Sequence, residues 1–149
     1  MSGIIGGTGS KSGVIGETEL DYETGTWTPA IVGSQGSAGT WSNAGQEGDY
    51  IKIGKIVYFS MYAYVTNAGS YSGTCQINGL PYACTGFGNQ VACSTSAYPF
   101  NVTTNVGATV LGGQSFIRFS KGAYNETNYQ WSEQVNGHNT SVAGCYHIA

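Results

Sequence analysis

The sequence predicts an all-β protein: an antiparallel β-sandwich, jelly-roll-like single domain that carries an extended glycine-rich N-terminal arm. The 149 residues include 24 glycines and 11 tyrosines, and only 9% of them are charged, against about 25% in ordinary domains. Glycine disfavours helices, whereas tyrosine, threonine, valine and isoleucine favour strands. Apolar and polar residues alternate with a period of two, and turn residues separate these stretches at short intervals, as in sandwiches and jelly rolls.

Residues 1–20 form the predicted arm. Two similar segments, SGIIGG and SGVIGE, follow each other there and contain Ile4, Ile5, Val14 and Ile15. Their glycines prevent a stable helix, so the arm alone would be flexible. We expect these paired apolar residues to dock on a neighbouring subunit and to anchor the protein. The acidic residues that follow are expected to form a solvated hinge rather than a metal or catalytic cluster.

The predicted β-domain covers residues 21–149. Its first strand is expected at residues 25–32, with Pro29 at a sheet edge or a strand end because proline cannot donate to a ladder. Trp27 in this strand is expected to be a plug in the core or at an interface, so it joins the candidate assembly residues. Residues 33–48 are rich in glycine, serine and asparagine and are predicted to be a loop.

The strongest strand signal is the segment DYIKIGKIVYFSMYAYVT, in which Gly54 is predicted to form a turn between two strands. After the turn, residues alternate between an apolar set and a polar-aromatic set, which predicts one core face and one outer face. The predicted core residues are Val57, Phe59, Met61, Ala63 and Val65. The outer set includes Tyr58, Tyr62 and Tyr64, which we expect to form the interface of a homotrimer.

Weaker signals predict the remaining strands, which bring the total to about eight, with no helix. Cys75 and Ile77 share one face before a turn at Asn78 and Gly79. The other expected strands lie near residues 90–95, 106–110, 117–119, 128–135 and 141–149.

Composition argues against several partners. The net charge is −3, and the five lysines and arginines do not cluster, so no nucleic acid partner is expected. No run approaches the roughly 18 apolar residues of a membrane span. The N-terminus also differs from a secretory signal, which begins with basic residues before a long apolar run. We therefore expect a soluble protein without membrane attachment or an export signal.

The four cysteines, Cys75, Cys84, Cys93 and Cys145, form no CxxC pair, and only two histidines accompany them. Structural zinc sites need four ligands in tight local groups. The favoured interpretation is buried free thiols that act as small apolar residues, although a later disulfide stays open. We expect no metal and no cofactor.

No pattern indicates catalysis. The eight acidic residues show no marked pair of the kind that glycosidases use, and neither histidine accompanies a GxSxG elbow. The glycine-rich segments lack the GK[ST] ending of a phosphate-binding loop. We therefore expect a protein that is not an enzyme, with a small glycan-cleaving enzyme as a weaker hypothesis.

One aromatic cluster offers an alternative. Tyr124, Tyr129 and Trp131 lie near His138 and two asparagines in the sequence, and exposed aromatic rings can stack on sugars or anchor protein interfaces. These four residues are candidates for binding a host cell-surface glycan. Burial in the core or in a subunit interface is the favoured explanation for Trp131.

Three segments carry a resemblance to a known family: SKSGVIGETELDYETGTWTPAIVG, GDYIKIGKIVYFSMYAYVT and SGTCQINGLPYAC. In this order and spacing they resemble a C-terminal domain of tail-fibre and other virion structural proteins of bacteriophages. The resemblance covers roughly residues 10–85. It implies a non-enzymatic β-domain, commonly trimeric, which is assembled in the bacterial cytoplasm and displayed on the virion surface among other capsid or tail proteins.

Only about 20 residues precede the domain, which leaves no room for a fibre shaft. We therefore expect a small head decoration or cement protein, or a fibre protein, held by its arm. The alternative is a receptor-binding tail-fibre tip that recognises a host cell-surface glycan.

Overall fold

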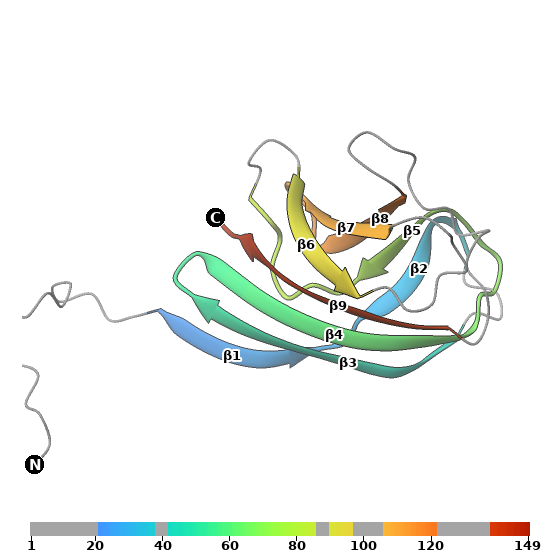
Figure 1. Cartoon of the computed structure of the whole chain (residues 1–149), viewed down its shortest axis with the longest axis horizontal. Helices are drawn as coiled ribbons and strands as arrows, with labels where there is room; N and C mark the ends of the chain where they lie inside the picture. Colours follow the sequence, from blue (N-terminus) through green and yellow to red (C-terminus); the bar gives the residue numbers. More distant parts are fainter. Residues whose placement is uncertain (1–20, 38–41, 86–89, 97–105, 122–137) are drawn as a thin grey trace, which may run out of the picture.

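The computed structural model describes residues 21–37, 42–85, 90–96, 106–121 and 138–149. Every regular element within these ranges is a β-strand (Figure 1). The strands are β1 (Tyr22–Trp27), β2 (Ala30–Gly36), β3 (Ser42–Ile53), β4 (Ile56–Asn67), β5 (Tyr71–Asn78), β6 (Gln90–Ser96), β7 (Val106–Leu111), β8 (Phe116–Lys121) and β9 (His138–His147). The described residues include no helix long and apolar enough to cross a membrane.

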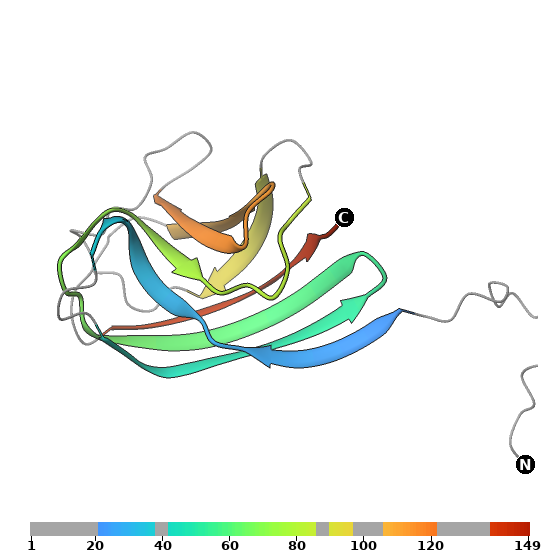
Figure 2. The ribbon, with the colours of Figure 1, turned by 180° about the vertical axis from the view of Figure 1, so that it is seen from behind.

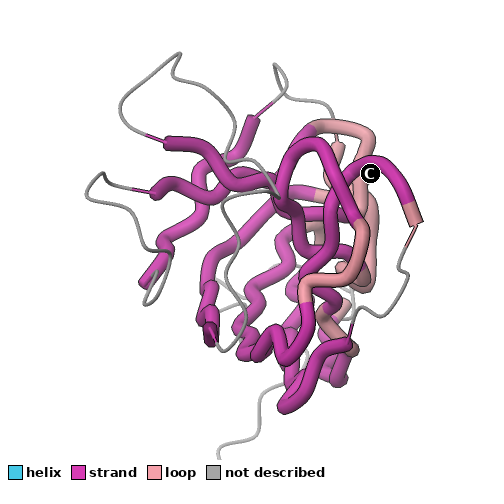
Figure 3. The backbone as a smooth tube through the Cα atoms, turned by 90° about the vertical axis from the view of Figure 1, so that its right-hand side faces the viewer, coloured by secondary structure: helices cyan, strands magenta, loops and turns pink. Residues whose placement is uncertain are grey.

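The strands form two antiparallel sheets that pack against each other. Sheet A has the order β1-β3-β4-β9-β6, and sheet B has the order β6-β7-β8-β5-β2. Strand β6 belongs to both, because residues 90–93 pair with β7 and residues 94–96 pair with β9. Viewed from the side, the described chain consists of strands joined by short loops (Figure 3). This architecture confirms the predicted all-β sandwich.

The predicted strand at residues 25–32 is in fact two strands in different sheets. β1 ends at Trp27, and after Thr28 and Pro29 the chain continues as β2 at the edge of sheet B (Figure 2). Pro29 has no N–H for a ladder and a fixed φ, so a strand break there is physically favoured. The Gln46 side-chain amide donates to the Pro29 carbonyl over 2.7 Å and holds the crossing in place.

The predicted loop at residues 33–48 was also wrong over most of its length. β2 continues to Gly36, and β3 begins at Ser42. The pairing of β3 with β4 shifts register between Ala44 and Glu47, and Gly45 there adopts a φ of 58°. A bulge of this kind absorbs an irregular residue, so the glycine-rich segment still pairs with its neighbour.

The β3–β4 hairpin agrees with the prediction. Gly54 has a φ of 56° at the turn, where a side chain would be strained. The predicted core residues of β4 are at most 5% exposed: Val57, Phe59, Met61, Ala63 and Val65. Their burial contributes about 1.5–3 kcal/mol for each large side chain, which gives this strand a strongly fixed register.

Sheet B supplies the other half of the core. Its buried residues from the predicted strands are Cys75 and Ile77 on β5, Ala108 and Val110 on β7, and Ile117 and Phe119 on β8. The turn after β5 contains Gly79 with a φ of 104°. The weak strand near residues 90–95 is β6, and the last strand begins three residues earlier than expected. The strand predicted at residues 128–135 lies outside the described residues.

The segment after β5 closes one end of the sandwich. The Cys84 N–H donates to the Gln114 carbonyl over 2.9 Å, and the Thr85 N–H donates to the His147 carbonyl over 2.8 Å. The segment therefore joins the β7–β8 turn of sheet B to the end of β9 in sheet A. Tyr82 lies in this segment, and its hydroxyl donates to the carboxylate of Glu23 near the beginning of β1.

Candidate assembly surface

The outer face of sheet A carries an unusual number of exposed apolar side chains. Among the described residues, all large hydrophobic side chains that are exposed lie on this face: Tyr22 (58%), Ile51 (42%), Ile53 (40%), Tyr58 (50%) and Tyr62 (38%). They come from β1, β3 and β4 because side chains alternate along each strand. Single exposed hydrophobic residues are ordinary, but a contiguous set marks an interaction site.

The strand register makes this set continuous. Tyr22 on β1 lies opposite Ile53 on β3, and Ile51 lies opposite Tyr58 on β4. Tyr58 in turn lies opposite Cys145 on β9, which is also exposed. Directly opposed side chains in antiparallel strands have Cβ atoms about 4.5–5.5 Å apart. Tyr22, Ile51, Ile53 and Tyr58 therefore form one apolar surface, and Tyr62 lies farther along β4, opposite Glu47 and Ser141.

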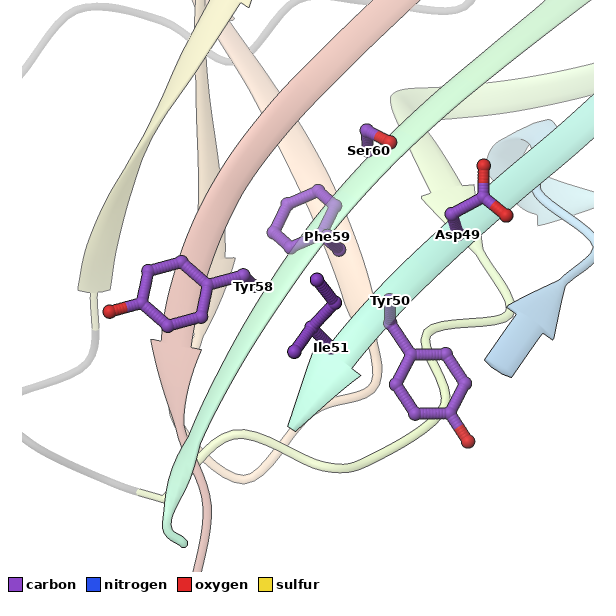
Figure 4. A pocket seen from close by; sticks show the side chains of 6 residues that line it. All are labelled: Asp49, Tyr50, Ile51, Tyr58, Phe59 and Ser60. Atoms are coloured by element: carbon purple, nitrogen blue, oxygen red, sulfur yellow. The ribbon is translucent and has the colours of Figure 1, made fainter. Parts of the chain in front are cut away.

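A shallow hollow of about 250 Å³ lies in this surface (Figure 4), lined by Asp49, Tyr50, Ile51, Tyr58, Phe59 and Ser60. Ile51 and Tyr58 form its apolar walls, and the Asp49 carboxylate and Ser60 hydroxyl lie at one end. Its volume falls below the roughly 300–1,000 Å³ of small-molecule sites. It is suited instead to a side chain of a protein partner, as in the central pockets of interfaces.

The three tyrosines predicted for the homotrimer interface all belong to this face. Tyr58 and Tyr62 are exposed, and Tyr64 is half-buried. Sequence reasoning missed Tyr22, Ile51 and Ile53, although the alternation in YIKI was visible. These three residues belong to the face because β3 pairs with β4 and β1 pairs with β3. The pattern of a single strand does not reveal such pairing.

Trp27 has a different place from the one expected of an assembly residue. It is 8% exposed, and its ring packs edge-on against Phe59 with centroids 6.3 Å apart. Trp27 is thus a plug in the core, which is one of the two places expected for it, rather than an exposed contact residue. Its indole N–H has no hydrogen-bond partner among the residues that the structure describes.

Two acidic residues of the predicted hinge are tied to the domain. The Lys52 ammonium contacts the Asp21 carboxylate at 2.5 Å. The Glu23 carboxylate accepts hydrogen bonds from the Tyr50 hydroxyl at 2.5 Å and the Tyr82 hydroxyl at 2.7 Å. Asp21 and Glu23 are exposed, as expected of a solvated segment, but these contacts tie both residues to the domain. Glu17 and Glu19 lie outside the described residues.

These hydrogen bonds shift the titration of the groups involved. The bond from Tyr50, followed by the bond from Tyr82, lowers the pKa of Glu23 because both stabilise the carboxylate. The same contacts raise the pKa of the Tyr50 and Tyr82 hydroxyls. The cluster fixes the beginning of β1 to β3 and to the segment that follows β5.

The thiols divide into two classes. Cys75 and Cys84 are buried, and Cys145 is exposed. Burial raises the pKa of both buried thiols, which makes them poor nucleophiles. The side chain of Cys93 lies outside the described part. Within the described ranges, no three His, Cys, Asp or Glu side chains are grouped so that they could hold a metal ion.

Several candidate residues lie beyond what the structure describes. They are the arm residues Ile4, Ile5, Val14 and Ile15, and the glycan candidates Tyr124, Tyr129 and Trp131. His138 is the first residue of β9, but its side chain is not among those described. Their expected roles therefore stay predictions.

Comparison with known proteins gives a fold relationship. No protein-family model matches the chain, and no curated protein matches it. The fold is similar to part of the crystal structure of the Dettilon tailspike protein (gp208), with a TM-score of 0.65 and 18% sequence identity. The similarity covers 85% of this chain and 24% of the tailspike chain. At this identity the comparison establishes a shared β-fold, and this chain spans about a quarter of the tailspike chain.

Proposed function

We propose that this protein is a non-enzymatic structural component of a bacteriophage particle, displayed on its surface, and that it assembles as a homotrimer through the outer face of sheet A. The observation that carries the proposal is the concentration of exposed apolar side chains on that one face. The sequence resemblance to virion proteins and the fold similarity to a domain-sized part of a tailspike protein support it.

Self-assembly through this face has a physical basis. Tyrosines are preferred anchors at interfaces because they bury much area with few rotatable bonds. Tyr58 and Tyr62 stand four residues apart on one strand, which places them about 13 Å from each other. In a closed cyclic assembly, every copy would bury both tyrosines against a neighbouring copy.

For the position on the particle, we propose the tail. A head decoration protein and a tail component are both compatible with the exposed face. The similarity to a tailspike protein favours the tail, and so a fibre or spike component over a head cement protein. Electron microscopy of intact particles labelled with an antibody against this chain would test it: label on the tail supports the assignment, and label on the head contradicts it.

Attachment to other virion proteins is proposed to depend on residues 1–18. Deletion of these residues should leave the β-fold intact by circular dichroism but abolish co-sedimentation with particles that lack the protein. A full-length control with Ser10→Ala and Ser12→Ala should attach normally, because it keeps the apolar pairs. Attachment of the deleted form at the wild-type level would refute the anchor.

A tail position leaves room for recognition of a host glycan as a second function. Its candidate residues are those outside the described part, chiefly Trp131. Trp131→Ala should then abolish adsorption to host cells while the fold is retained, and unchanged adsorption would refute this role. Incubation with host polysaccharide should release no new reducing ends; release would contradict the non-enzymatic proposal.

A further inference from the structure

The N-terminal segment joins the domain at the turn between β3 and β4. The Gly54 N–H donates to the Asp21 carbonyl over 2.7 Å, and the Asp21 carboxylate contacts Lys52. These contacts hold the start of β1 beside the hairpin turn (Figure 1). Residues 1–20 therefore connect to the sandwich at this end of sheet A.

The apolar groups of the outer face gather at the same end. The row nearest the turn contains Tyr22, Ile53 and Ile56, which lie opposite one another on β1, β3 and β4. The next row brings Ile51 beside Tyr58 and contains the hollow. An incoming segment would meet this apolar end of the face first.

The direction of β1 favours docking of the N-terminal segment on a neighbouring copy over docking on its own chain. β1 runs from Tyr22 at the hairpin end toward Trp27 in the core. A chain that extended the line of β1 backwards from Tyr22 would leave the sheet at the hairpin end. A return to the hollow of the same chain would need a reversal, whereas a second copy beyond the sheet end can be reached directly.

Residues 11–15 have the length and the charge that an occupant of the hollow needs. Val14 precedes Asp21 by seven residues, which span up to about 23 Å when extended. Val14 and Ile15 are branched aliphatic residues without charge, as an apolar hollow requires. Lys11 is the sole charged side chain in residues 1–16, and the exposed carboxylate of Asp49 lies at one end of the hollow.

We infer that Val14 and Ile15 of one copy bind in the hollow between Ile51 and Tyr58 of a neighbouring copy, with Lys11 beside Asp49. This inference rests on the proposed self-assembly and names the partner of that end of the face. It divides the arm into two functional parts. The second apolar pair joins the copies, and the first pair, Ile4 and Ile5, stays available for other virion proteins.

The exposed thiol of Cys145 provides a direct test, because Cys145 lies opposite Tyr58 on β9. In full-length protein carrying Val14→Cys, oxidation with diamide should form a disulfide between residues 14 and 145 of different copies. Non-reducing electrophoresis should show linked oligomers, and peptide mass spectrometry should identify the cross-link. A Thr8→Cys variant and a Val14→Cys, Cys145→Ser variant are matched controls, and both should remain largely unlinked.

The outcomes separate the inference from the proposed function. A disulfide between residues 14 and 145 within one chain would overturn the inference, because the segment would then cover its own domain. A trimeric mass before oxidation with no cross-link would also overturn it and leave the proposed assembly standing. A monomeric mass before oxidation would overturn both.

Discussion

The outer faces of the two sheets differ although both belong to one sandwich. Sheet A exposes Tyr22, Ile51, Ile53, Tyr58 and Tyr62. Sheet B presents polar groups along its centre, and its described residues expose no large hydrophobic side chain. Its central row places Gln76 opposite Arg118, and Arg118 opposite Thr109. The Arg118 guanidinium also lies over the Phe116 ring, 6.0 Å from its centroid.

This difference between the outer faces indicates which of them is the candidate contact surface. Both inner faces are apolar because folding requires a core, so they do not distinguish the sheets. Exposed apolar side chains lower solubility, and among the described residues the large ones lie on sheet A. We therefore propose sheet A as the contact surface, whereas the central outer side chains of sheet B, Gln76, Arg118 and Thr109, are half-buried in the single chain.

The largest expected effect comes from removing the tyrosine anchors of sheet A. The double variant Tyr58→Ser and Tyr62→Ser should convert the proposed trimer to monomers at micromolar concentration, because each interface anchor contributes about 2 kcal/mol or more. Sedimentation equilibrium measures the mass. The double variant Gln76→Ser and Thr109→Ser on sheet B is the control and should remain trimeric. Equal effects of both variants would remove the distinction between the faces.

A core substitution should act on folding rather than on assembly. Phe119 on β8 is fully buried, so Phe119→Ala should lower the free energy of unfolding by about 3–5 kcal/mol. Ile51→Ser on the outer face should change it by less than about 0.5 kcal/mol. Both substitutions should be measured by urea unfolding in the background of the Tyr58→Ser, Tyr62→Ser variant. Because this variant is expected to be monomeric, subunit association does not contribute. A large loss of stability with Ile51→Ser would place Ile51 in the core instead.

Gly48 tests the position of Trp27 on the inner face. A Cβ atom at Gly48 would lie 2.5 Å from the Trp27 indole nitrogen, so Gly48→Ala should cost about 1–3 kcal/mol through overpacking. Gly107→Ala is the control and should cost less, since among the described residues its Cβ would meet only the Ser120 hydroxyl, at 3.2 Å. Thermal unfolding with Trp fluorescence reports both. A neutral Gly48→Ala would indicate that Trp27 is not packed there.

The smallest expected effect concerns pH and the start of β1. The folded pKa of Glu23 lies below its ordinary value of 4.5, so its stabilising contribution is present above that value and is lost as pH falls through the folded pKa. The melting temperature of wild type should exceed that of Glu23→Gln at pH 7, and the gap should shrink below about pH 4.5. Tyr82→Phe should lower the melting temperature at pH 7 by part of the amount that Glu23→Gln does. A gap that stays constant from pH 7 to 3 would exclude the carboxylate as its source.

The sequence predicted the fold where local alternation was long. The β3–β4 hairpin followed from Gly54 and from the period of two along β4. The change of sheet at Pro29 was missed because alternation does not specify which sheet a strand joins. β3 pairs through a glycine-rich segment, and the pairing depends on β4 rather than on its own composition.

The candidate site was predicted in part for the same reason. The tyrosines of β4 could be assigned to an outer face from one strand, whereas Tyr22 and Ile53 required the register of three strands. The partners of the acidic residues are also distant in sequence: Glu23 meets Tyr82 across 59 positions, and Asp21 meets Lys52 across 31. Nothing in the local pattern indicates such contacts.

The most direct test of the contact surface is hydroxyl-radical footprinting of the wild-type protein at a concentration where it is assembled. Labelling of Tyr58 and Tyr62, read by mass spectrometry, should be strongly reduced relative to the monomeric fraction, although both side chains are exposed in the single chain. Labelling of Phe116 on sheet B should be the same in both fractions. Full labelling of Tyr58 and Tyr62 in the assembled protein would contradict the account.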